Sequence, residues 1–333
     1  MTIDIPGKLF ISGEYAVLYG AHAVLAPVER TMTFECVPGR KDTFVSSHYG
    51  PIDLENTAAV PESIRRAYTT ARDYLRLKGI PPRPFLLRVK SALDHKGRKL
   101  GLGSSGALTV GIIRSIAEFH GAPLEKDTLY KLSVLSQRHQ ARHASFADIA
   151  VSVHGAWILY RRFDRDWFNR HADLPLEKLL KSPWPKLLIK PFRPGALHAF
   201  AVNSLHPASS KALVETFMHN FDEAENPSLI DTVDQLSLTL YNELRTQAKG
   251  TKTLSALDQA YDQSMRAASV DLKPVPLKTL MTTINAFGGV SKISGAGGGD
   301  CVLAFFEDPE AYKKALDYFT KSEYPCIHFR RNL

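Results

Sequence analysis

Gly101-Leu102-Gly103-Ser104-Ser105-Gly106 is the segment that decides the fold of this 333-residue chain. A helical repeat follows it directly, and the apolar face of that repeat is formed by Leu108, Ile112, Ile116 and Phe119. Glycine loops that open a helix bind anions, because the first-turn amides lack an intrahelical acceptor, the helix dipole adds positive charge, and glycine lets a phosphate approach the backbone. The hydroxyls of Ser104 and Ser105 add ligands for phosphate or magnesium. The segment therefore predicts a phosphate-binding loop, and the simpler interpretation is a turn that only packs a helix on a sheet.

The same segment matches the pattern Gly-x-Gly-x-x-Gly, but it does not suit a dinucleotide site. That site requires an apolar strand immediately before the first glycine, whereas residues 94–99 (Asp-His-Lys-Gly-Arg-Lys) form a polar stretch for which we expect a loop. A Walker loop is excluded because Ala107 follows Gly106 where that motif needs lysine. The nearby cations Lys96, Arg98 and Lys99 favour an anion site.

A second glycine loop, Gly295-Ala296-Gly297-Gly298-Gly299-Asp300, has an apolar strand pattern on each side. A tight hairpin turn would use glycine in the same way, because glycine supplies positive φ wherever a turn requires it. Two such loops in one chain favour a role in binding.

Two charged residues lie inside apolar segments. Lys8 lies in an apolar strand pattern near the N-terminus, where a lysine is costly unless it is paired or its chain reaches solvent. Asp148 lies between Ala147 and Ile149, where it could simply cap a helix. Both are candidate functional residues, weighed against an edge-strand lysine and a helix cap.

Strand-like and helix-like patterns alternate along the chain, which predicts a mixed α and β fold. Strands are expected at residues 8–12, 22–35, 85–90, 290–294, 301–306 and 326–330. Helices are expected at residues 62–78, 127–141 and after Asp308, with helical faces at 213–221, 233–244, 254–265 and 277–284. The ending suggests a ferredoxin-like half. Four prolines between residues 183 and 195 predict a boundary between domains 1–185 and 186–333.

The composition is that of a folded protein, with 44% hydrophobic and 23% charged residues. No stretch approaches the roughly 18 apolar residues that span a bilayer, and the first residues lack the pattern of a signal peptide. We therefore expect a cytoplasmic protein that does not bind membranes. The widely spaced Cys36, Cys301 and Cys326 indicate neither a disulfide framework nor a zinc site.

A net charge of +8 favours anionic partners. Nucleic acid is not expected among them, because the chain has no recognition motif. Between Asp127 and Asp148 there is no acidic residue, and the basic residues of this segment are Lys131, Arg138, His139, Arg142 and His143. The segment suits a site where two anionic molecules meet, and it equally suits a solvated basic helix face.

Four segments together resemble the ordered motifs of the GHMP kinases, and within that superfamily they are most similar to phosphomevalonate kinases. They are Pro6-Gly7-Lys8 through Val17, Gly101 through Ala107, Ser145 through Ser152, and Ser294 through Asp300. The resemblance spans nearly the whole chain. Ala147, His154 and Ala156 depart from the expected glycine, tyrosine and glycine. Gly106 and Tyr15 differ from the alanine and histidine usual in mevalonate kinases, which favours the phosphomevalonate group.

The resemblance implies an α+β fold of two domains, with an N-terminal half like ribosomal protein S5 domain 2 and a ferredoxin-like C-terminal half. It implies transfer of phosphate from ATP, with Mg²⁺, to 5-phosphomevalonate, giving 5-diphosphomevalonate in the mevalonate route to isoprenoids. Lys8 and Asp148 would be catalytic, and Ser105 would contact magnesium. The implied ATP-binding residues are Lys99, Gly101, Leu102, Gly103, Ser104, Ser105 and Gly106. The implied substrate-binding residues are Lys8, Tyr15, Ser145, Ala296 and Gly297.

The chemistry of phosphoryl transfer gives Lys8 the larger role, because alignment and positive charge supply most of the catalysis. A phosphate monoester is largely dianionic at neutral pH, so an acceptor of this kind needs no base. Asp148 would then hold Lys8 and orient the acceptor, whereas with an alcohol as acceptor it would remove a proton. The alternatives are a mevalonate kinase, the related decarboxylase, or a metabolite-binding relative without activity. We expect a monomer or a homodimer.

Overall fold

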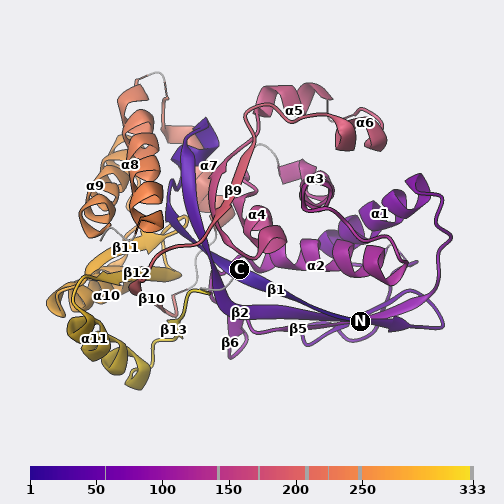
Figure 1. Ribbon diagram of the computed structural model, residues 1–333, viewed down its shortest axis with the longest axis horizontal. Helices are drawn as coiled ribbons and strands as arrows, with labels where there is room; N and C mark the ends of the chain where they lie inside the picture. Colours follow the sequence, from indigo (N-terminus) through magenta and orange to yellow (C-terminus); the bar gives the residue numbers. More distant parts are fainter. Residues whose placement is uncertain are drawn as a thin grey trace.

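Strand β2 (His22–Pro38) runs through the first of two large sheets in this computed structural model (Figure 1). Residues 23–28 of β2 are buried, and burial then alternates along the strand, which is the pattern of a strand that leaves the core centre for its rim. Strand β1 (Thr2–Ser12) pairs antiparallel with β2 over almost its full length. The other edge of β2 is shared by β8 at residues 22–25 and by β5 at residues 32–38. The structure describes residues 1–56, 58–140, 143–171, 173–206, 210–223, 225–246 and 250–330.

The first sheet has the strand order β4-β3-β5-β2-β8-β9, with β1 beside β2. Its remaining strands are β3 (Thr43–Ser46), β4 (Ile52–Asp53), β5 (Phe85–Ser91), β8 (Trp157–Arg161) and β9 (Leu188–Phe192). Helices cover one side of this sheet (Figure 1). They are α1 (Glu62–Leu77), α2 (Ser104–Phe119), α3 (Lys126–Ser136) and α4 (Ala147–His154). The shorter helices of this half are η1 (Ala16–Tyr19), η2 (Arg138–Gln140), α5 (Arg165–His171) and α6 (Leu176–Lys181).

The second sheet has the order β11-β12-β10-β13, and every adjacent pair is antiparallel. In chain order these strands are the second, third, first and fourth of a βαββαβ unit, so the ferredoxin-like prediction is confirmed. The strands are β10 (His198–Asn203), β11 (Val290–Ser294), β12 (Cys301–Phe306) and β13 (Cys326–Ile327). The helices are α7 (Ser210–Asn220), α8 (Pro227–Arg245), α9 (Thr251–Ala267), α10 (Val275–Ala286) and α11 (Pro309–Lys321).

Most of the expected helices and strands are present, because the apolar periodicity and the residues that start or end helices indicated the same elements. The Asp308 carboxylate caps α11 by accepting from the amides of Glu310 and Ala311, and Pro309 is the first helical residue. The expected helix at 127–141 is shorter, since α3 ends at Ser136 and is followed by the separate turn η2. Residues 141–142 lie outside the described part of the chain.

The expected polar loop at residues 94–99 is instead a small hairpin, and that prediction was wrong. Strands β6 (Asp94–His95) and β7 (Arg98–Lys99) pair antiparallel around Lys96 and Gly97. Both turn residues have positive φ, 49° and 77°, as two-residue hairpin turns require. The hairpin precedes the first glycine loop as a short structured element.

The change from one sheet to the other falls within the proline-rich region and just after it. β9 still pairs with β8 of the first sheet, and β10 begins the second sheet at His198. The division into 1–185 and 186–333 stays a prediction, and sheet membership alone would divide the chain between residues 192 and 198. A bridge between Val28 and Phe329 also returns the end of the second half to the first sheet.

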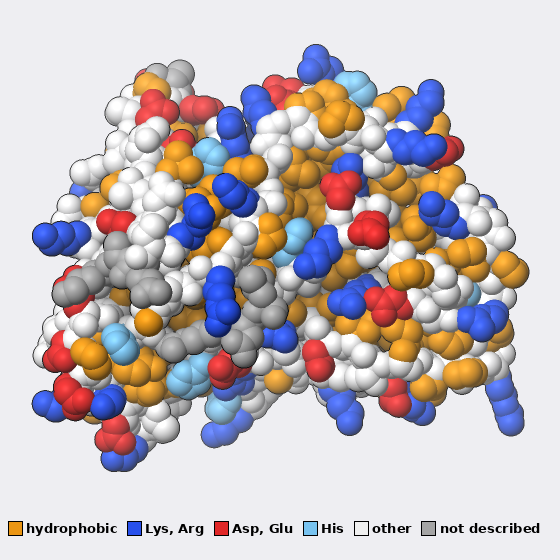
Figure 2. Space-filling model, viewed as in Figure 1, with side chains coloured by type: hydrophobic (Ala, Val, Ile, Leu, Met, Phe, Trp, Pro, Cys, Tyr) orange, Lys and Arg blue, Asp and Glu red, His pale blue; other side chains and the backbone are white. Residues whose placement is uncertain are grey.

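The excess positive charge of the chain does not gather in one patch on the face shown in Figure 2. On the face in Figure 2, Lys and Arg side chains are spread out with Asp and Glu side chains among them, and they form no continuous stripe. In the described part of the chain, no helix is long and apolar enough to cross a membrane.

Candidate active site

Lys8 lies in β1 where this strand passes the first glycine loop. Its backbone amide donates to the carbonyl of Leu102 at 2.9 Å, and its ammonium donates to the carbonyl of Gly101 at 3.2 Å. The ammonium also lies 5.5 Å from the centroid of the Phe10 ring. The strand therefore holds the loop through its backbone and carries a cation to the same place, as expected for a lysine in an apolar strand.

Residues of β1, β10 and β12 donate hydrogen bonds to backbone carbonyls in the first glycine loop and just before it. The carbonyl of Leu100, just before the loop, accepts from the side-chain amide of Asn203 at 3.1 Å and from the thiol of Cys301 at 3.4 Å. Asn203 ends β10 and Cys301 begins β12, so both reach the loop from the second sheet. Gly101 and Gly103 have φ of 70° and 76°. Left-handed residues in a loop that opens a helix turn N–H groups toward a common concave face, which suits an anion.

Lys8 and Asp148 approach the backbone of the first glycine loop so closely that an added Cβ would collide with them at two positions. A Cβ at Gly103 would lie 2.9 Å from Cγ of Lys8 and 3.4 Å from Cβ of Asp148. A Cβ at Gly106 would lie 2.6 Å from Oδ2 of Asp148. The structure thus brings Lys8, Asp148 and the first glycine loop together, which the sequence predicted only through the resemblance.

Asp148 lies where the N-termini of two helices meet. It is the second residue of α4, and the amides of Ile149, of Asp148 itself and of Gly106 in α2 all favour its charged form. Burial has the larger effect and raises the pKa of the Asp148 carboxyl, while the charge of Lys8 lowers it. Helix N-termini and a nearby ammonium are the groups that hold a carboxylate beside a bound anion.

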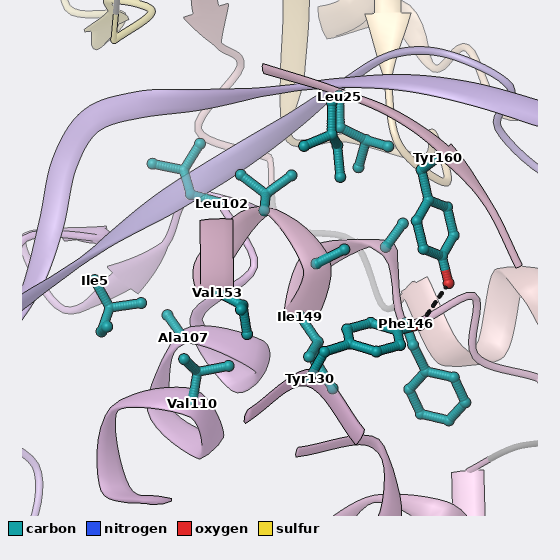
Figure 3. Close-up of a cluster of buried hydrophobic side chains, with 14 of the residues drawn as sticks. Ile5, Leu25, Leu102, Ala107, Val110, Tyr130, Phe146, Ile149, Val153 and Tyr160 are labelled. Atoms are coloured by element: carbon teal, nitrogen blue, oxygen red, sulfur yellow. Dashed lines mark hydrogen bonds between the residues drawn. The ribbon is translucent and has the colours of Figure 1, made fainter. Parts of the chain in front are cut away.

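A chain of buried hydroxyls fixes the backbone that leads to Asp148. The hydroxyl of Tyr160 donates to the carbonyl of Ser145 at 2.6 Å, and the hydroxyls of Tyr130 and Tyr160 are 2.9 Å apart. Because the Tyr160 hydroxyl has one proton and donates it to the carbonyl of Ser145, the Tyr130 hydroxyl must be the donor in its hydrogen bond with Tyr160. In Figure 3 the hydroxyl end of Tyr160 points toward Tyr130, close to Phe146. Phe146 has a φ of 58°, a strained value for a bulky residue, and it is buried in this cluster.

The two glycine loops meet at Asp300 and Gly101. A Cβ at Gly101 would lie 2.4 Å from both Cγ and Oδ2 of Asp300. Asp300 has a φ of 61°, and its backbone is held by His206 and Ser204 of the segment after β10. One loop comes from each half of the chain, so their contact marks the junction of the halves as the candidate site.

The second glycine loop is fastened by two tyrosines. The hydroxyls of Tyr15 and Tyr261 both donate to the carbonyl of Ala296, at 2.6 Å and 3.4 Å. A Cβ at Gly297 would lie 2.6 Å from the Tyr261 hydroxyl and 2.8 Å from the carbonyl of Leu272. Burial raises the pKa of both phenols, so both remain donors. Tyr15, expected to bind substrate, is buried and holds this loop.

A buried ion pair between Glu14 and Lys292 joins the two halves, and sequence reasoning missed it. Their charged atoms are 2.6 Å apart, and the side chains are 4% and 2% exposed. Nearby, the hydroxyl of Ser294 donates to the carbonyl of Phe10 at 2.8 Å. The signal that singled out Lys8, a lysine within an apolar strand, is also present at Lys292 in β11 and could have found it.

The remaining predicted residues lie around the first loop. Ser104 begins α2 and is half-buried, Ser105 is exposed in the same first turn, and Leu102 is buried. Lys99 is exposed on the hairpin, paired in register with Asp94. The hydroxyl of Ser145 accepts from the amide of Ala147 at 3.4 Å, so it supports the start of α4.

Lys131 does not contribute to a basic surface where two anionic molecules could meet, so that interpretation of the segment between Asp127 and Asp148 was wrong for this residue. Its side chain is buried, its ammonium donates to the carbonyls of Leu180 and Ser182 at 3.0 Å each, and it pairs with Asp127 at 2.8 Å. Lys131 thus fastens α3 to the end of α6 and offers no charge to the site. Arg138 pairs with Asp173 at 3.8 Å. Arg142 lies outside the described residues.

The oxygen-rich donor set of the first turn of α2 suits magnesium better than a softer metal. Within the described ranges, no group of three or more His, Cys, Asp or Glu side chains could hold a metal ion. Mg²⁺ often takes only one or two protein oxygens and completes its shell with waters and substrate phosphates. The exposed hydroxyl of Ser105 fits such a role.

Models of one protein family match both halves of the chain. The model for the N-terminal domain of GHMP kinases matches residues 63–156, and the model for the C-terminal domain of GHMP kinases matches residues 250–326. The two matches follow in that order and together span more than half of the chain. Each match lies within one of the two predicted domains.

Individual relatives extend the likeness to nearly the full length. A phosphomevalonate kinase from Streptomyces sp. (strain CL190) is 28% identical over 332 residues, covering 91% of this chain and 88% of that protein. A mevalonate kinase from Aeropyrum pernix is 23% identical over 320 residues, covering 92% and 88%. The Streptococcus pneumoniae phosphomevalonate kinase, solved in complex with phosphomevalonate and AMPPNP, has a TM-score of 0.87 at 22% identity and covers 100% of both chains. With both domain models matched in order and one fold shared from end to end, this chain belongs to the GHMP kinase family and is a phosphotransferase of its two-domain α+β architecture.

Proposed function

We propose that this chain transfers the terminal phosphoryl group of ATP to 5-phosphomevalonate and so produces 5-diphosphomevalonate. The observation that carries the proposal is the junction at which the two glycine loops, one from each half, meet beside the Lys8 ammonium. Two phosphorylated molecules that react with each other need backbone donors for both and a cation between them. The 28% identity to a phosphomevalonate kinase, higher than the 23% to a mevalonate kinase, supports this acceptor.

ATP would bind at the first glycine loop. The opening amides of α2 and the left-handed glycines Gly101 and Gly103 support a triphosphate there. Lys99 lies on the hairpin just before the loop and would approach the nucleotide from solvent. Ser105 would provide a hydroxyl ligand for Mg²⁺, and the ion, when bound, would neutralise part of the charge on the nucleotide phosphates.

Lys8 would stabilise the charge on the phosphoryl group during transfer. It needs no large movement to do so, since its ammonium already lies at the carbonyl of Gly101 within the loop. The acceptor phosphate is largely dianionic at neutral pH and attacks without losing a proton. Asp148 would therefore act as an orienting group that restrains Lys8, rather than as a base. Its position between two helix N-termini supports this role.

The alternative acceptor is mevalonate, whose hydroxyl would need a base, and Asp148 would then take the proton. An assay that offers mevalonate, phosphomevalonate and diphosphomevalonate separately with ATP distinguishes the candidates. We expect release of ADP with phosphomevalonate only, and diphosphomevalonate as the product. Turnover of mevalonate with none of phosphomevalonate would overturn the proposal, and ligand binding without turnover of any of the three would favour a metabolite-binding relative.

A further inference from the structure

The carbonyl of Ala296 in the second glycine loop is held by two side-chain hydroxyls. It accepts from Tyr15 at 2.6 Å and from Tyr261 at 3.4 Å. The two tyrosines come from different halves of the chain, one beside η1 and one in α9, and their rings lie 6.1 Å apart. Such an arrangement fixes the orientation of a whole peptide plane, because a peptide bond is rigid and planar.

That orientation determines where the next amide points. In a trans peptide the C=O of one residue and the N–H of the next point in opposite directions, so the N–H of Gly297 points away from both tyrosines. Among the described residues this amide has no hydrogen-bond acceptor, whereas the next amide, of Gly298, donates to Leu272 at 2.6 Å. A backbone donor that is held in place without a protein acceptor is suited to an anionic ligand.

The tyrosines are themselves held by the buried charges of the junction. The ring of Tyr261 has the Lys292 ammonium 5.8 Å from its centroid and the Lys273 ammonium at the same distance. Lys292 is paired with Glu14, the residue immediately before Tyr15. Tyr15 packs on Phe217 with ring centroids 4.3 Å apart. The network therefore reaches Ala296 from both halves of the chain.

We propose that Tyr15 and Tyr261 are positioning residues that hold the Ala296 peptide so that the Gly297 amide binds the phosphate of the acceptor. This inference rests on the proposed function, because it assigns the phosphate of phosphomevalonate to that amide. The two tyrosines act through the backbone and need not touch the substrate. Their effect therefore belongs to binding of the acceptor and not to binding of ATP.

The test compares the full chain with its Tyr15→Phe, Tyr261→Phe and double variants, each assayed for ADP release with phosphomevalonate and ATP. Tyr15→Phe keeps the ring on Phe217 and removes the shorter hydrogen bond. We expect the KM for phosphomevalonate to rise about tenfold, as the loss of one buried hydrogen bond predicts, with the KM for ATP unchanged. Tyr261→Phe should have a smaller effect. The double variant should lose more than the product of the single effects, because both bonds share one acceptor.

Tyr19→Phe is the matched control, since Tyr19 lies four residues along the same segment and packs against Phe221 with ring centroids 5.4 Å apart. It should behave as the unaltered chain. If Tyr15→Phe and Tyr261→Phe both leave the KM for phosphomevalonate unchanged, or raise both KM values equally with a lower melting temperature, the positioning role is wrong while the proposed function stands. If the unaltered chain does not phosphorylate phosphomevalonate at all, the proposed function is wrong, and the positioning role is wrong as well.

Discussion

At the scale of single residues, the site depends on one ammonium and one carboxylate with different tasks. Lys8 approaches the loop that would hold ATP, and Asp148 lies between two helix N-termini with a raised pKa. Neither residue is an ordinary surface charge, because each packs so closely against a loop glycine that an added Cβ would collide with it. Removing the ammonium should therefore affect the chemistry more than neutralising the carboxylate.

Lys8→Met is expected to lower kcat with phosphomevalonate by about 10²- to 10³-fold, because it removes a cation from the developing charge. Asp148→Asn keeps the shape and one acceptor oxygen, and it should retain appreciable transfer. Steady-state kinetics of the two purified variants, with circular dichroism as a check of folding, measures this difference. Equal and near-total losses in the two variants would contradict these assigned roles of Lys8 and Asp148.

The sequence predicted Lys8 but not Lys292, although both are lysines in apolar strands. Lys8 lies within a recognisable motif, the segment from Pro6 to Val17, whereas the partner of Lys292 is Glu14, which lies 278 residues away along the chain. Residues near Lys292 in the sequence therefore do not indicate which carboxylate it pairs with. The contact between the Tyr15 hydroxyl and Ala296 is equally long-range and could not be predicted, while the substrate-binding role that the resemblance implies for Tyr15 stays a prediction.

At the scale of elements, the two glycine loops are positioned by the strands that flank them. Periodicity and capping residues predicted the flanking strands and the helix that opens at Ser104, because burial of one face leaves a regular pattern. The hairpin at residues 94–99 was missed because each of its strands is only two residues long, too short to show alternation. The contact between the loops could not be predicted, because it depends on how the two sheets pack.

Gly101→Ala tests that contact directly. Its Cβ would lie 2.4 Å from the Asp300 carboxylate, so the two loops would be pushed apart, and we expect kcat/KM to fall about 100-fold, as misplacement of reacting groups by an ångström predicts. Gly97→Ala is the matched control, because Gly97 has a similar φ of 77° but nothing within 4 Å of the added atom. It carries the same backbone strain without the collision. Similar activities of the two variants would contradict a role for the loop contact.

At the scale of the whole molecule, the two halves are joined by buried polar contacts as well as by apolar packing. The Phe10 carbonyl of β1 and the side chains of Glu14 and Tyr15 in the turn after it contact β11 and its loop. Their partners are Ser294, Lys292 and Ala296. The ion pair of Glu14 and Lys292 is nearly without solvent, so each charge depends on the other.

Lys292→Met should lower the free energy of unfolding by about 3–5 kcal/mol, because it leaves the Glu14 carboxylate buried without a partner. The double variant Glu14→Gln/Lys292→Met should recover much of that loss, since no isolated charge remains. Urea unfolding of both variants, followed by fluorescence, measures the difference. A double variant as unstable as Lys292→Met, or a Lys292→Met variant as stable as the unaltered chain, would be inconsistent with this account.

The contacts between β1 and the second glycine loop also bear on how the protein is made. Phe10, Glu14 and Tyr15 find their partners 284, 278 and 281 residues later in the chain. During synthesis the lysine-bearing strand leaves the ribosome long before the residues that complete its surroundings exist. A nascent chain that stops short of residue 296 can form the first sheet but not the junction. Competence for phosphoryl transfer should therefore arise late, in one step, when the last domain closes on the first strand.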